Sequence, residues 1–79
     1  MQLDLKSRIE KDIETFYKNL NTLSTKNFNS EYKNIVELAE MYAKDSQSYL
    51  EKGDLVTAFS CISYAHGLLD AVRRFIGRD

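Results

Sequence analysis

Apolar residues recur along this chain with the spacing of α-helices. Near the amino terminus they follow steps of four, four, three, four and three, which places them in one narrow stripe: Leu5, Ile9, Ile13, Phe16, Leu20 and Leu23. Nearly all the remaining positions of this segment are polar. The pattern predicts a first helix that docks along a single seam.

Two further helices are predicted, separated by a tight turn. Helical periodicity extends from about Ser30 to Lys52 and again from about Leu55 to Ile76. Gly53 suits the left-handed backbone conformation that closes a helix, and Asp54 can cap the free amides of the next one. We therefore expect the chain to reverse direction at this point.

The polar stretch 24–29 predicts the other connection, with Phe28 turned over the end of the core. The three predicted helices come out at about 21 to 23 residues each, or about 32 to 35 Å. Helices of equal length joined by short turns are typical of an up-and-down bundle. We predict an all-α fold, a three-helix up-and-down antiparallel bundle that forms one domain over residues 1–79.

Composition limits the class of protein. A chain of 79 residues, 43% hydrophobic and without proline, is suited to one compact helical domain. The single cysteine, Cys61, cannot form an internal disulfide, as is usual in a reducing compartment. The amino terminus does not resemble a signal peptide, and we expect no later apolar run long enough to span a bilayer. The sequence therefore predicts a cytoplasmic protein without a membrane partner.

The charges give no sign of a nucleic-acid partner. The 11 basic and 12 acidic residues are interleaved and leave a net charge of −1. A small RNA-related enzyme or a nucleic-acid-binding domain is the alternative function. It requires five basic residues to gather in one patch: Lys44, Lys52, Arg73, Arg74 and Arg78.

Catalytic chemistry has little support in the sequence. His66 and Asp70 lie one helical turn apart, so a carboxylate could orient an imidazole, or both could bind one metal ion. A zinc site normally needs three or four ligands, however, and a surface network of Asp70 with His66 and an arginine explains the same residues. We predict no catalytic, cofactor-binding or metal-binding residue, and the sequence leaves open whether the protein is an enzyme.

Gly67 is the most informative residue of the third helix. A glycine inside a helix costs about 1 kcal/mol relative to alanine. The buried arc of this helix is centred near Ala58 and Ile76, and Gly67 points about 180° away from that centre. Small residues precede and follow it at intervals of four, so the outward side forms a shallow strip.

We predict that this strip is an interface, either for a second copy of the chain or for a different protein. Its residues are Ser60, Ser63, Tyr64, Gly67, Ala71 and Arg74, with Tyr64 and Arg74 as anchors at its margins. A solvated face without a partner is the open alternative.

Two resemblances add to this interpretation. The segments 43–45, 49–54 and 64–71 (AKD, YLEKGD and YAHGLLDA) resemble a small archaeal family catalogued only as a domain of unknown function. That resemblance implies a closed three-helix bundle and supplies no activity, substrate or catalytic residue. The hairpin around Gly53 is also similar to a single tetratricopeptide motif, but the pattern does not recur one repeat earlier, which argues against a tandem array.

Overall fold

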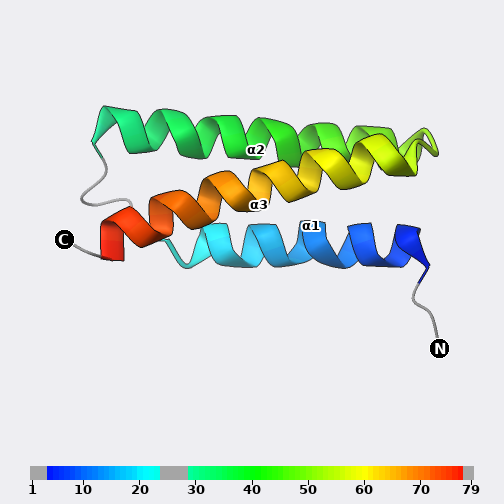
Figure 1. The fold of residues 1–79 in the computed structure, drawn as a ribbon, viewed down its shortest axis with the longest axis horizontal. Coiled ribbons are helices and arrows are strands. Elements are labelled where there is room, and N and C mark those ends of the chain that lie inside the picture. Colours follow the sequence, from blue (N-terminus) through cyan, green and yellow to red (C-terminus); the bar gives the residue numbers. More distant parts are fainter. Residues whose placement is uncertain (1–3, 24–28, 78–79) are drawn as a thin grey trace.

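Three helices account for nearly all of the described chain. The computed structural model describes residues 4–23 and 29–77, with α1 at Leu5–Asn21, α2 at Ser30–Glu51 and α3 at Leu55–Gly77. In Figure 1, α2 runs antiparallel to both α1 and α3. The predicted all-α, three-helix up-and-down bundle is confirmed.

A side-chain cap begins each helix. Asp4, Asn29 and Asp54 each accept a hydrogen bond at Oδ1 from the amide three residues further on, at 2.7, 2.8 and 3.2 Å. Such a cap satisfies one of the amides that a helix leaves free at its start and contributes about 1 kcal/mol. The helix starts are therefore set by local sequence.

The turn between α2 and α3 forms as predicted. Gly53 has a φ of +83°, in the left-handed region that glycine adopts without strain. Its amide donates to the Leu50 carbonyl at 3.1 Å, and the Asp54 amide donates to the Tyr49 carbonyl at 2.9 Å. These two bonds satisfy carbonyls at the end of α2 in the pattern of a Schellman motif.

The predicted equal lengths are wrong for α1, which has 17 residues against 22 in α2 and 23 in α3. At its end the Thr22 hydroxyl donates to the Asn19 carbonyl at 2.9 Å, a local bond that competes with continued helix. Leu23 lies beyond the helix and packs on the core. Phe28 lies outside the described residues.

The middle position in the bundle belongs to α3 (Figure 1). It contacts α2 most extensively and α1 next, whereas α1 and α2 contact each other least. The buried core draws on all three helices: Ile9, Ile13 and Phe16 from α1; Val36, Ala39, Ala43 and Leu50 from α2; Ala58, Ile62, Ala65, Leu69 and Val72 from α3. Because two neighbours flank α3, only its outward side is left uncovered.

By length and composition alone, Leu55–Ile76 qualifies as a candidate membrane span, so the expectation that no apolar run reaches that length is wrong. The core helix of a globular protein passes the same test, because it too is long and apolar. Only 28% of the apolar stretch is buried within the bundle, however. Leu55, Phe59, Leu68 and Ile76 are partly buried against the core, so the exposed residues of this helix gather on its outward side.

One buried polar side chain links α2 to α3. Ser46 is fully buried, and its hydroxyl donates a 2.6 Å hydrogen bond to the Ala58 carbonyl. A buried hydroxyl without a partner would be costly, so this bond favours one alignment of the two helices.

We expect Ser46→Ala to lower the free energy of unfolding by about 1 kcal/mol, because it removes the hydroxyl and its bond to Ala58. Ser48→Ala is the matched control: Ser48 is exposed, so its removal should change stability by less than about 0.5 kcal/mol. Urea unfolding followed by circular dichroism measures both. Equal effects of the two variants would contradict a structural role for the Ser46 bond.

Candidate functional site

The six residues predicted as an interface lie along one side of α3, here called the outer face: Ser60, Ser63, Tyr64, Gly67, Ala71 and Arg74. Five of them are exposed, and Ala71 is half-buried. α1 and α2 therefore leave most of this side of the helix exposed.

Gly67 has no structural reason to be glycine within a single copy of the chain. It lies in the interior of α3, and a Cβ atom built there would meet nothing within 4 Å. Its φ is not in the left-handed region, unlike that of Gly53. Alanine would therefore be accommodated in the isolated bundle, and no contact within the bundle requires glycine at this position.

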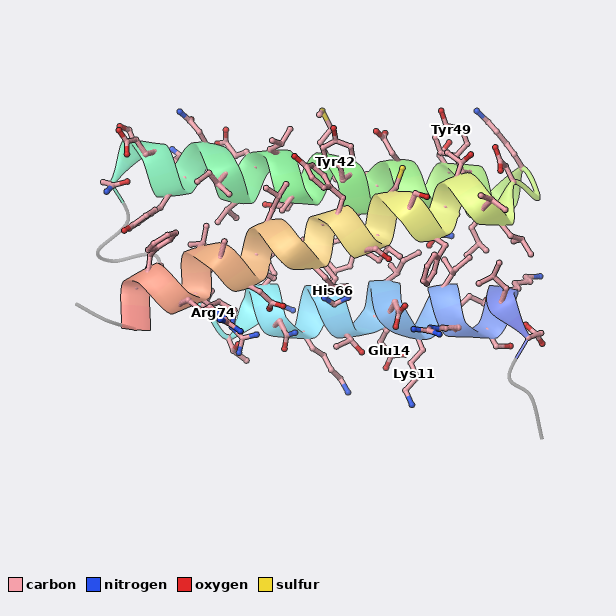
Figure 2. All side chains as sticks on the ribbon, viewed as in Figure 1. Lys11, Glu14, Tyr42, Tyr49, His66 and Arg74 are labelled. Atoms are coloured by element: carbon pink, nitrogen blue, oxygen red, sulfur yellow. The ribbon has the colours of Figure 1, made fainter. Side chains whose placement is uncertain are left out.

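An aromatic pair borders the outer face on the side of α2. The rings of Tyr42 and Tyr64 meet edge to face, with their centroids 4.7 Å apart, and Figure 2 shows Tyr42 on the side of α2 that faces α3. Tyr64 is nevertheless 51% exposed. The contact restricts the Tyr64 ring while leaving much of its surface open to solvent.

His66 and Asp70 do not form the predicted pair. His66 Nε2 lies 2.8 Å from the Asp12 carbonyl oxygen of α1, and its ring packs edge to face on Phe16. Asp70 Oδ1 instead lies 3.7 Å from Arg73 Nη1. The expected surface network thus contains an arginine but not His66, which joins α3 to α1.

Arg8 and Phe59 make a second contact between α1 and α3. The Arg8 guanidinium lies 5.3 Å from the centroid of the Phe59 ring, and Arg8 Nε lies 3.9 Å from Asp12 Oδ2. Sequence reasoning missed both Arg8 and Asp12. The contacts of Arg8 with Phe59 and of Asp12 with His66 join distant parts of the chain, so no local spacing could have identified them. The Arg8–Asp12 pair, in contrast, has the four-residue spacing of one helical turn.

Cys61 is a poor candidate for a nucleophile. Burial raises the pKa of its thiol, and the nearby carboxylates of Asp45 and Asp54 raise it further. A raised pKa leaves less of the reactive thiolate. Within residues 4–23 and 29–77, no three His, Cys, Asp or Glu side chains gather as a metal ion would require.

The basic residues of the nucleic-acid alternative are spread along the bundle. Lys52 caps the end of α2, next to the start of α3, whereas Arg73 and Arg74 lie near the end of α3. About 20 residues of helix, or roughly 30 Å, separate them. Arg78 lies outside the described residues.

A family match covers most of the chain. Residues 11–76 match the model of the family described as protein of unknown function (DUF357). The chain belongs to this family. The match includes the whole outer face and confirms the resemblance to a domain of unknown function; the archaeal origin and the tetratricopeptide-like hairpin stay predictions. No curated protein matches the chain.

Gly67→Ala should raise the free energy of unfolding by up to about 1 kcal/mol at low protein concentration, because alanine is the better helix former and meets no obstacle. Gly53→Ala is the contrasting control. It should lower stability by about 1 to 2 kcal/mol, because the left-handed conformation is strained for alanine. Chemical denaturation of dilute protein measures both. A loss of stability at position 67 would mean that Gly67 is packed within the bundle.

Proposed function

We propose that this protein is a noncatalytic protein-interaction or self-association module whose contact surface is the outer face of α3. The observation that carries the proposal is that this exposed face has no charge over most of its length, from residue 55 to residue 69. Residues 55–69 contain no Asp, Glu, Lys or Arg, although five of them are exposed: Val56, Ser60, Ser63, Tyr64 and Gly67.

The outward sides of α1 and α2, unlike residues 55–69 of α3, are rich in charged residues. Exposed charges are spread over the outward side of α1, where Lys11 and Glu14 project away from the bundle (Figure 2), and over that of α2, from Glu31 to Glu51. Charged side chains are usual on a solvated helix and are depleted at the centre of protein interfaces, where tyrosine is enriched. Between residues 55 and 69, the outer face of α3 shares two features with an interface centre: it has no charged residue and it exposes a tyrosine.

The shape of the outer face supports the same function. Small side chains at Ser60, Ser63 and Gly67 leave room for another helix to approach closely. Tyr64 at one margin and Arg74 near the end are residue types that often anchor interfaces. Support for a reaction is weaker among the described residues, since His66 is engaged with α1 and the Cys61 thiol has a raised pKa.

Ser63→Glu tests the proposal, because it places a charge in the middle of the uncharged face. Glutamate is at least as good a helix former as serine, so the bundle should stay folded. Association should weaken roughly 30-fold or more, because burying an unpaired charge in an interface costs about 2 kcal/mol or more. Sedimentation measures self-association, and capture from lysate with tagged protein measures a different partner.

Thr15→Glu is the matched control, since Thr15 is exposed on α1 and is flanked by Lys11 and Lys18. It should leave both the mass and any captured partner unchanged. If Ser63→Glu also retains the mass and the partners of the wild type, the outer face is not the contact surface.

A further inference from the structure

We infer that the partner on the outer face is a second copy of this chain, bound about a two-fold axis with the two α3 helices antiparallel. The inference rests on the proposed function and specifies its partner. A two-fold dimer requires one surface that complements itself. The outward side of α3 has this property in spacing, in side-chain size and in charge.

The spacing is the same when read from either end. One row of outward residues advances by four, four, three, four and four: Val56, Ser60, Tyr64, Gly67, Ala71 and Phe75. It contains the large apolar side chains that α3 leaves exposed in the described chain, Val56, Tyr64 and Phe75, at 74%, 51% and 50%. A second copy would cover all three at once.

A two-fold axis between Ala65 and His66 brings complementary sizes together. Because this point is close to the middle of Leu55–Gly77, the two helices overlap over their full length. Tyr64 then lies opposite the other copy's Gly67, where the space above the backbone is open. Ser60 lies opposite Ala71, and Val56 opposite Phe75. The arrangement supplies the reason for glycine at position 67 that a single bundle lacks.

Two anchor rings of this row are already restrained within each copy. Tyr42 contacts the Tyr64 ring edge to face at 4.7 Å, and Tyr32 stacks on Phe75 with centroids 6.3 Å apart and planes 9° from parallel. Side chains that are ordered before association lose less entropy on binding. Each copy therefore presents both rings in place for a partner.

Charge selects the antiparallel direction. Beside the start of α3 lie two acids and one base, Glu51, Lys52 and Asp54, whereas its end carries one acid and two bases, Asp70, Arg73 and Arg74. The two ends thus have opposite net charge, with no charge between residues 55 and 69. In antiparallel packing, each end of α3 lies beside the oppositely charged end of the other copy, and the two helix dipoles point in opposite directions, which is favourable. In parallel packing, ends of the same net charge would lie side by side.

Cysteine cross-linking of the full chain tests the geometry. In a Cys61→Ala background, Ser60→Cys protein is mixed with Ala71→Cys protein and mildly oxidised. The mixture should form disulfide-linked dimers, because positions 60 and 71 face each other across the two-fold axis. Ser60→Cys alone should not, since its two copies lie about 16 Å apart along the helices, and a disulfide requires Cα atoms within about 7 Å. Thr15→Cys mixed with Ala71→Cys controls for random collision.

Sedimentation equilibrium of the wild type should give twice the 9.2 kDa mass of one chain. Linkage of Ser60→Cys to itself would overturn the antiparallel geometry, and a wild type that stays monomeric at high concentration would overturn the second copy as partner. In that case a different partner that is lost in Ser63→Glu but kept in Thr15→Glu leaves the proposed function standing. If neither variant changes the binding of any partner, both the dimer and the proposed function are wrong.

Discussion

α3 must pack against two neighbouring helices at once, and the rest of the structure depends on this constraint. A helix that lies between two others must present apolar or small residues over more than half of its circumference. Ala58 and Ala65 are fully buried, as are Ala39 and Ala43 on α2, so these helices can approach closely. Ile62 and Leu69 fill the remaining core together with residues of α1. The outward side of α3 is what these contacts leave over.

Local sequence predicts the fold well because the decisive signals are local. Gly53 and Asp54 specify a turn through backbone conformation and a cap, both of which act within a few residues. The length of α1 could not be predicted in the same way. Its apolar stripe continues to Leu23, but the Thr22 hydroxyl bonds within its own turn and the helix ends at Asn21. Hydrophobic periodicity indicates which side of a helix is buried, but it does not show where a local hydrogen bond ends the helix.

The residues of the candidate site also differ in how far local sequence could predict them. The outward direction of Gly67 follows from 100° per residue and needs no tertiary information. The partners of His66 could not be inferred, because the Asp12 carbonyl lies 54 residues away in the chain. Helical spacing suggested Asp70 instead, which is near in sequence but pairs with Arg73. Spacing along one helix identifies possible partners only within that helix.

The unequal contacts among the helices also bear on how the bundle assembles. The α2–α3 hairpin closes a turn of only a few residues and forms the most extensive contact in the molecule, so its formation costs little chain entropy. α1 joins mainly through α3, with the Arg8–Phe59 and His66–Asp12 contacts along that seam. We therefore expect the α2–α3 hairpin to form first during folding and α1 to add last and to detach first.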